Sequence, residues 1–366
     1  MPTWGEELQE LGELVREAQG RASEEGPPSP GNPSPHDILR RTHLKALSQK
    51  TERATIVYAT AWLEEREGLS ADVLSIGLGD KHGFMEAVSN IQERELDLFL
   101  HSPGGSPEAA EAIIEYLRTR FDHIRAIVPL AAMSAATMMA LACDEIVMGA
   151  HSQLGPIDPQ LTIHTPEGPR SAPGQAIIDQ FALAKKECQD PTNIGAWLPI
   201  LRSYGPGLIA ICDHQRALAE DFAARSLEQH MFAGEADGAQ KAKAAAAWFA
   251  DFAAFRSHSR RVSRDDAREQ GLKVLDLEQD DDLQDAILSV HHAVQHTLSG
   301  TQAGKIIENH HGRAWIRQAG VIQMIQAPAQ MPGPQGQPPM LAPQPVPPQT
   351  NRPPPPPNRR GKRRGR

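Results

Sequence analysis

The chain has 366 residues, of which 40% are hydrophobic, 23% are charged and 5% are aromatic, and its formal net charge is −9. This length and apolar content are enough for a large buried core. Three cysteines without a CxxC pair exclude a disulfide scaffold and a thiolate zinc site, and they favour a reducing, cytoplasmic compartment. The polar first residues contain no apolar stretch typical of a secretory signal.

The first part of the chain is expected to be helical. Residues 4–19 have the pattern of a short amphipathic helix, residues 26–35 form a Gly/Pro/Ser linker, and a second helix is expected over 37–49. We therefore treat residues 1–50 as an N-terminal helical extension that precedes the main domain.

Strands and helices alternate from residue 54 onward. The strands are rich in β-branched and apolar residues, as buried strands are, and Ser106 and Pro107 mark the start of a helix. This alternation predicts an α/β fold with a largely parallel sheet covered by helices. The expected strands are 54–61, 96–101, 124–128 and 145–148, and the helices between them are 84–91, one that begins at Pro107, and 134–143.

One uncharged run, residues 126–143, could be mistaken for a membrane span. Its length is at the lower limit for a spanning helix, roughly 18 residues. Pro129 interrupts it, however, and Ser134 and Thr137 make it partly polar. A buried strand, a tight turn and a buried helix of small residues explain the run better, so we expect no membrane span.

Beyond residue 159 the pattern is mainly helical, and it ends in a tail of low complexity. We assign residues 51–322 to the main domain and 323–366 to a disordered Pro/Gln-rich tail with polyproline character and a basic end. Removing the seven positive charges of the tail leaves about −16 on residues 1–325. This balance argues against a nucleic-acid-binding body, whereas the tail could contact nucleic acid or anionic surfaces non-specifically. The expected helices are 176–189, 208–231, 239–255, 265–272 and 281–298.

Two turns at strand ends carry the chemical information. His101-Ser102-Pro103-Gly104-Gly105 places two glycines between a strand and a helix, where free backbone amides could hold an oxyanion. Ala132-Met133-Ser134-Ala135-Ala136-Thr137 places a serine at the start of a helix of small residues, where it could act as a nucleophile. Taken singly, each could be an ordinary turn or a helix cap. In a parallel sheet both turns reach the same edge, so nucleophile and oxyanion donors could converge.

These blocks, together with LGPIDPQ at 154–160, resemble the serine dehydrogenase proteinase family of ClpP-like and signal-peptide-peptidase-A-like serine peptidases. The resemblance implies the ClpP/crotonase fold, a spiral of ββα units with a helical C-terminal part. It also implies Ser134 as nucleophile and Gly104 and Gly105 in the oxyanion loop. Relatives with this fold form rings or stacks, so the resemblance implies a homo-oligomer that cleaves peptide or protein substrates.

The general base is not fixed by the sequence. A Clp-type histidine would fall near Asp158, where none is present, and His151 comes early after Ser134, although a loop could bring it to the serine. Relatives of the signal-peptide-peptidase type use a lysine, for which Lys185 and Lys186 are the candidates, provided that burial or a nearby cation lowers the pKa. Asp158 could orient a base or simply shape a turn between two prolines. His258 is a candidate for a structural or substrate contact.

No cofactor or metal site is expected. The histidines at 291, 292, 296, 310 and 311 lack carboxylates or cysteines at ligand spacing, which favours a polar helix face. No Walker loop is present, so any ATP dependence would come from a partner ATPase. We therefore predict a serine peptidase, and two alternatives stay open. They are a ClpP-fold scaffold that has lost its base and a crotonase-type acyl-CoA enzyme.

Overall fold

The computed structural model describes residues 3–25, 32–165 and 168–320. All the described residues belong to one compact unit, which is separate from residues 323–366. The Pro-rich tail with its basic end, and most of the 26–35 linker, lie outside the described residues. None of the described helices is both long and apolar enough to cross a membrane.

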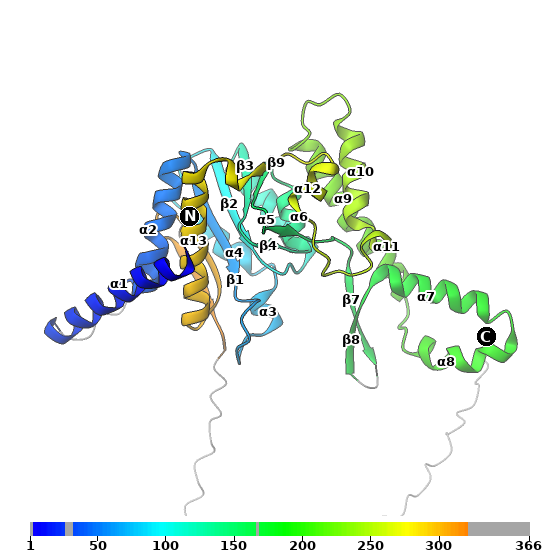
Figure 1. Ribbon diagram of the computed structural model, residues 1–366. Coiled ribbons are helices and arrows are strands. Elements are labelled where there is room, and N and C mark those ends of the chain that lie inside the picture. Colours follow the sequence, from blue (N-terminus) through cyan, green and yellow to red (C-terminus); the bar gives the residue numbers. More distant parts are fainter. Residues whose placement is uncertain (1–2, 26–31, 166–167, 321–366) are drawn as a thin grey trace, which may run out of the picture. The chain divides into compact units, whose positions relative to one another are not determined.

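The centre of the unit is a seven-stranded sheet of order β11-β10-β1-β2-β3-β5-β9 (Figure 1). Its pairs β1–β2, β2–β3, β3–β5 and β5–β9 are parallel, whereas β10 is antiparallel to both β1 and β11. The predicted α/β fold with a largely parallel sheet is therefore confirmed. The strands are β1 (Ala54–Thr60), β2 (Glu95–His101), β3 (His123–Val128), β5 (Glu145–Met148), β9 (Val274–Asp276), β10 (Ala303–Asn309) and β11 (Ala314–Gln318).

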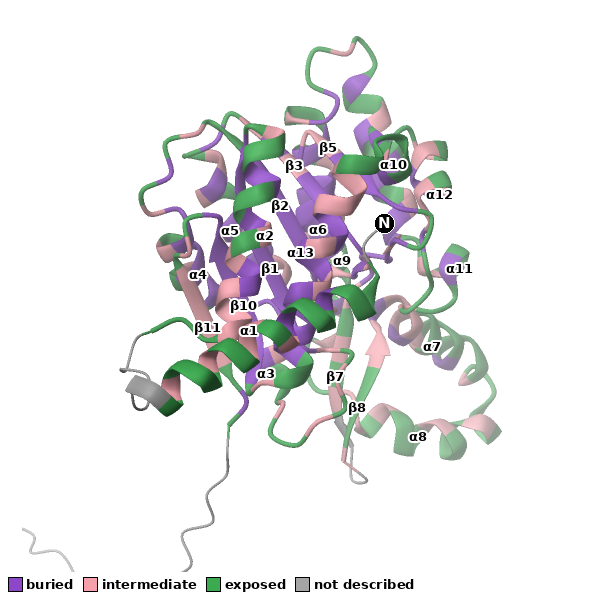
Figure 2. Cartoon of the chain, turned by 60° about the vertical axis from the view of Figure 1, so that its left-hand side comes forward, coloured by how far each residue is buried: buried purple, intermediate pink, exposed green. Residues whose placement is uncertain are grey.

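Helices cover both faces of this sheet, and Figure 2 shows the strands buried between them. Because side chains alternate along a strand, Leu98 and Leu100 of β2 join one core and Phe99 joins the other. The first core lies under α5 (Pro107–Arg118), α6 (Ala135–Leu141), α9 (Leu208–Gln229) and α10 (Gly238–Ala250). The second lies under α2 (Pro35–Thr51) and α13 (Asp281–Gly300).

A second, small sheet produces the ββα repeat. After β3 the chain forms β4 (Ala131–Ala132) and then α6, and after β5 it forms β6 (Gln153–Leu154). The two short strands pair in parallel, Ala131 with Gln153 and Ala132 with Leu154. Each of these two main strands is thus followed by a short strand in another sheet, as the predicted spiral of ββα units requires.

The remaining helices lie at the N-terminus, between the strands and on an extension of the unit. A hairpin of β7 (Gln160–Thr165) and β8 (Gly168–Pro173) projects from the sheet together with α7 and α8 (Figure 1). The helices are α1 (Trp4–Glu25), α3 (Ala71–Leu74), α4 (Asp80–Ala87), α7 (Gly174–Glu187), α8 (Ile194–Arg202), α11 (Phe252–Phe255) and α12 (Arg264–Glu269), with 3-10 turns at Pro191–Asn193 and Leu277–Gln279.

Several predictions differ from the structure for identifiable reasons. The helix predicted over 239–255 breaks at Asp251, whose side chain accepts hydrogen bonds from the Ala253 and Ala254 amides and starts α11. The polar helix face predicted for the histidines is wrong for His291 and His296 of α13, which are buried, and for His310 and His311, which lie in a turn after β10. The His296 ring lies 4.0 Å from the Trp4 ring, because α1 packs on this part of α13.

His101, the last residue of β2, is a buried histidine without a hydrogen-bond partner among the described residues. Its ring lies 5.6 Å from that of His291 and 5.8 Å from that of Trp62. Burial lowers the pKa of His101 from 6.5 to about 4. The folded state therefore keeps this ring neutral at a pH where the unfolded chain has taken up a proton.

This difference predicts a pH-dependent loss of stability. As the pH falls from 6.5 to 4, His101 should reduce the free energy of unfolding by about 3 kcal/mol and contribute no further change below that range. In His101→Phe this part of the pH dependence should disappear in urea titrations. The exposed His82→Phe is the control. An identical pH profile in His101→Phe and the wild type would contradict the prediction.

Candidate active site

The two turns singled out in the sequence lie in contact at the ends of neighbouring strands. The Ser102 amide donates to the Ala131 carbonyl at 3.1 Å, and the Met133 amide donates to the Ser102 carbonyl at 2.9 Å. These bonds form because β2 and β3 are adjacent and parallel, so both chains leave the sheet on the same side. The Gly104 loop and the Ser134 turn therefore form one structure.

Ser134 has an unusual backbone conformation, with φ 52° and ψ −121°. It stands between β4, which is fixed by its pairing with β6, and α6, so the chain must turn sharply within one residue. The close approach of Gly104, whose own φ is 101°, makes the turn tighter. A Cβ at Gly104 would lie 2.7 Å from Ser134 Cβ and 2.6 Å from the Met133 carbonyl oxygen. Only glycine can occupy this position beside the serine.

The backbone amides of the site differ in what they bind. The Gly104 amide donates to the Ser102 hydroxyl at 3.2 Å, so it is already engaged. Among the described residues, the Gly105 and Ala135 amides have no acceptor. Ala135 is the first residue of α6, where a helix leaves its amides unpaired. Two unpaired donors thus lie on either side of Ser134. One is on the glycine loop, residues 102–106, and the other is on the helix that Ser134 precedes.

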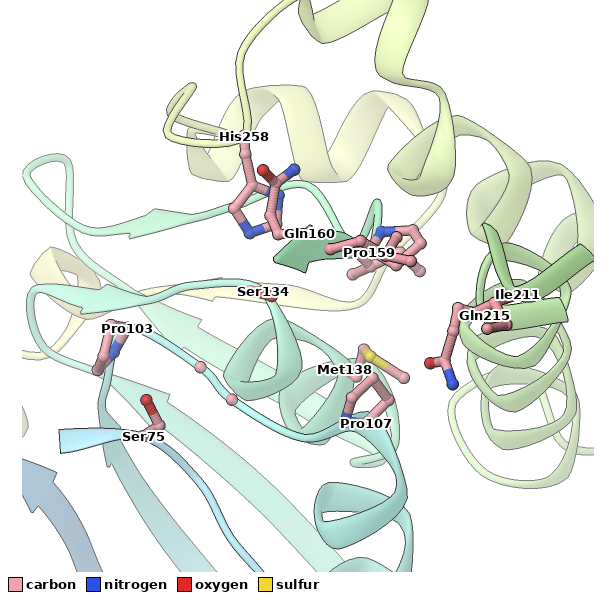
Figure 3. Close-up of a pocket in the computed structure, with 14 residues that line it drawn as sticks. Ser75, Pro103, Pro107, Ser134, Met138, Pro159, Gln160, Ile211, Gln215 and His258 are labelled. Atoms are coloured by element: carbon pink, nitrogen blue, oxygen red, sulfur yellow. The ribbon is translucent and has the colours of Figure 1, made fainter. Parts of the chain in front are cut away.

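Ser134 lines a pocket of about 450 Å³ between the sheet edge, the 157–161 segment and α9 (Figure 3). Its lining is mostly apolar, and His258 is its one side chain that can ionise. The lining residues are Ser75, Pro103, Gly104, Gly105, Pro107, Ser134, Met138, Ile157, Pro159, Gln160, Leu161, Ile211, Gln215 and His258.

His258 is held by Asp158, an arrangement that the sequence reasoning did not find. His258 Nδ1 lies 2.8 Å from Asp158 Oδ1, and Gln160 Nε2 donates to Asp158 Oδ2 at 2.9 Å. The Asp158 side chain is 3% exposed and that of His258 is 24% exposed, so the histidine still faces the pocket. In Figure 3 the His258 ring points toward Ser134.

The contact between the two segments is fixed by backbone pairing. The Ile157 amide donates to the Phe249 carbonyl at 2.9 Å, and Leu154 forms an antiparallel bridge with Val262. This pairing brings the 257–262 segment against the turn that carries Asp158. No spacing rule in the sequence could reveal it, because 100 positions separate His258 from Asp158.

The lysines predicted as general bases lie elsewhere. Lys185 and Lys186 are exposed in the last turn of α7, and neither lines the pocket. His151 is also exposed and outside the lining. The described chain therefore does not bring either lysine to Ser134, because α7 belongs to the extension that projects away from the sheet (Figure 1).

Two clusters of side chains with the right chemistry to bind a metal lie away from the pocket. Glu93, His310 and His311 have ligand atoms within 4.8 Å of one another, as do Glu7, Glu10 and His43. In the first group the Thr55 amide donates to His310 Nδ1 at 3.2 Å. The remaining nitrogen, Nε2, must then carry the proton of the neutral ring, which makes His310 a poor ligand.

Comparison with known proteins identifies the segment that carries the serine. Residues 71–192 match the ClpP-like SDH-type serine proteinases. This match includes both turns and confirms the family resemblance over that part of the chain. The matched segment also includes residues 157–161, which line one side of the pocket, whereas His258 lies beyond the matched residues.

Two curated proteins are similar to parts of the chain. Two uncharacterized proteins of Methanocaldococcus jannaschii are similar: MJ0137 is 44% identical over 70 residues, and MJ1495 is 39% identical over 103 residues. These alignments cover 19% and 28% of this chain, and 24% and 32% of the two relatives. The chain therefore spans less than a third of the length of each relative.

Among solved structures, the chain is similar to a mutant of the membrane-bound stomatin-specific protease 1510-N. It has 14% identity and a TM-score of 0.34, and the match covers 58% of this chain and 79% of that one. A similarity at this level has no bearing on the site.

The backbone of Ser134 leads to a stability prediction. A residue with a side chain at this φ and ψ is strained by roughly 1–3 kcal/mol, and glycine relieves that strain. The free energy of unfolding should therefore be about 1 kcal/mol higher for Ser134→Gly than for Ser134→Ala. Both variants lack the hydroxyl, so the difference in their urea midpoints isolates the backbone. Equal midpoints would mean that the serine turn is unstrained.

Proposed function

We propose that this chain is a serine peptidase in which Ser134 is the nucleophile and His258 is the general base, oriented by Asp158. One observation carries the proposal: the strained serine and the carboxylate-bound histidine line the same pocket. The match of residues 71–192 to serine proteinases supports a hydrolase of proteins or peptides. The proposal replaces the Ser-Lys pair expected from the sequence with a Ser-His-Asp arrangement.

In this mechanism His258 Nδ1–H donates a hydrogen bond to the Asp158 carboxylate, which stays ionised. Nε2 then has a free lone pair and can remove the Ser134 proton as the oxygen attacks a peptide carbonyl. Gly105 and Ala135 would donate to the oxygen of the tetrahedral intermediate, since their amides are unpaired. Gly104 would act by its size, because its missing side chain lets the loop approach the nucleophile. Collapse of the intermediate releases the amine, protonated by His258, and leaves an acyl-serine for water to hydrolyse.

The lysines keep one alternative role. Lys185 and Lys186 are on the projecting α7, so they could act at Ser134 only in the pocket of a second copy of the chain. An assembly of copies is also favoured by α8, which has no buried residue and exposes Ile194, Leu198 and Ile200. The homo-oligomer, the partner ATPase and the cytoplasmic location stay predictions; the three free cysteines fit a reducing compartment.

The proposal predicts a definite order of activities among variants. Ser134→Ala should abolish cleavage of a diverse peptide mixture, read as new termini by mass spectrometry. His258→Ala and Asp158→Asn should lower kcat by roughly 10²–10⁴-fold, because the proton acceptor is lost or misoriented. Lys185→Ala and Lys186→Ala are the matched controls and should leave kcat unchanged.

Other outcomes have distinct meanings. If a lysine variant loses activity while His258→Ala stays active, the general base is a lysine on α7 of another copy of the chain. Identical null profiles for the wild type and Ser134→Ala would contradict the peptidase proposal and favour the scaffold alternative.

A further inference from the structure

A buried polar network lies directly behind the glycine loop. Lys305 Nζ on β10 lies 2.7 Å from both carboxylate oxygens of Asp80, and the Tyr58 hydroxyl of β1 donates to Asp80 Oδ2 at 2.8 Å. None of the three residues is more than 1% exposed, and none lines the pocket. A carboxylate, an ammonium group and a phenol thus meet in the interior of the protein, outside the groups assigned to catalysis.

A first set of hydrogen bonds connects the network to the glycine loop through residues 75–77. Lys305 Nζ donates to the Ser75 carbonyl at 2.8 Å, and the Gly77 amide donates to Asp80 Oδ2 at 3.1 Å. Between these two anchors, the Ile76 amide donates to the Gly104 carbonyl at 2.7 Å. The Ile76 carbonyl accepts from the Ser106 amide at 2.9 Å. Ile76 therefore holds both sides of Gly105, and the network holds both sides of Ile76.

A second route runs through Ser102. The Ser102 side chain is among the groups that influence the pKa of Tyr58, and the Ser102 hydroxyl accepts the Gly104 amide at 3.2 Å. Burial and the Asp80 carboxylate raise the pKa of Tyr58 well above 10, so its hydroxyl keeps its proton and remains a donor. The two routes reach the loop from opposite ends, one at Ser102 and one at Ser106.

Stability alone does not account for such a network. Burying an ion pair costs desolvation energy that its attraction often only offsets, and apolar residues of similar volume are frequently as stable. The loop, in contrast, has a clear need for external support. Gly104 and Gly105 have φ values of 101° and 153°, and two successive glycines have little conformational preference of their own. An oxyanion donor must nevertheless be fixed before the reaction begins.

We propose that Tyr58, Asp80 and Lys305 are positioning residues that fix the Gly105 amide in the geometry required of an oxyanion donor. The inference rests on the proposed peptidase function for its catalytic consequence. The structural part of the inference, that the network holds residues 102–106 in place, is independent of the peptidase function. The three residues touch no substrate and take no part in proton transfer at Ser134.

The test uses isosteric variants of the full chain. Tyr58→Phe removes one hydroxyl and leaves the Asp80–Lys305 pair intact, and Tyr116→Phe, on a half-buried tyrosine of α5, is its control. Asp80→Asn removes the negative charge, so Lys305 loses its ion-pair partner but keeps a neutral hydrogen-bond acceptor. Its matched control is Asp97→Asn, which affects a buried carboxylate bound by Arg53 and Arg125 nearer the opposite end of β2. Asp80→Asn and Asp97→Asn should lose comparable stability. A difference between them in loop exchange or kcat therefore reports on positioning and not on folding.

Two measurements are made on each variant. Hydrogen exchange reports whether residues 75–77 and 102–106 open more often, and kcat and KM are normalised to the concentration of natively folded protein. We expect Tyr58→Phe and Asp80→Asn to speed exchange in both segments and to lower kcat by about 10-fold, less than the roughly 10²-fold or greater loss on deleting a donor. KM should change little, since the donors act mainly in the transition state. Both controls should match the wild type in these respects.

The outcomes separate this inference from the proposed function. Unchanged exchange in both segments, or a kcat equal to that of the controls, overturns the positioning role. If the wild type cleaves no peptide, the peptidase proposal fails, and exchange alone then decides whether the network holds the loop. Faster exchange with full kcat would show that the network orders the loop without serving catalysis, which also overturns the inference.

Discussion

The site depends on one close contact, that between Gly104 and the turn at Ser134. Two loops from adjacent parallel strands are joined by hydrogen bonds at Ser102, and the space left between them admits no side chain at Gly104. The same contact leaves Ser134 in a backbone region that residues with side chains avoid. Its strain is tolerated because β4 and α6, on either side, are fixed by the small sheet and by burial in the core. The position of the serine in the pocket lining and the unpaired amides follow from this geometry.

The second half of the site is built by a different part of the chain. The segment at 257–262 pairs with the 154–158 turn, and Thr137 ties that turn to the serine helix. Its hydroxyl accepts the Gly155 amide at 3.0 Å and donates to the Ala132 carbonyl at 2.7 Å. A residue within α6 thus fixes the distance between the helix and the turn that carries Asp158. The carboxylate is buried by the same contacts, which leaves His258 as its partner toward the pocket.

The sequence predicted what local patterns determine. Alternating strands and helices, the Ser106 cap and the serine turn all depend on neighbours in sequence, and the structure has each of them. The sequence could not reveal β10, because Lys305, Glu308 and Asn309 make it look exposed although every residue of the strand is buried. Their partners, Asp80 and Arg40, come from distant segments. The contact of His258 with Asp158 could not be predicted from the sequence for the same reason. Polar residues whose partners are remote cannot be assigned from spacing.

The charged residues that concealed β10 in the sequence are each paired inside the protein. A strand with buried charges is a poor choice for stability, since each charge must find a partner of the right geometry. In β10 one such charge is paired within the network behind the glycine loop, and another, Glu308, is bound by Arg40 and Arg41 of α2. Apolar packing is non-directional and leaves a glycine-rich loop free to shift, whereas hydrogen bonds to a buried ion pair specify direction as well as distance. Buried charge in this strand therefore gives the loop the orientation that the hydrophobic core cannot supply.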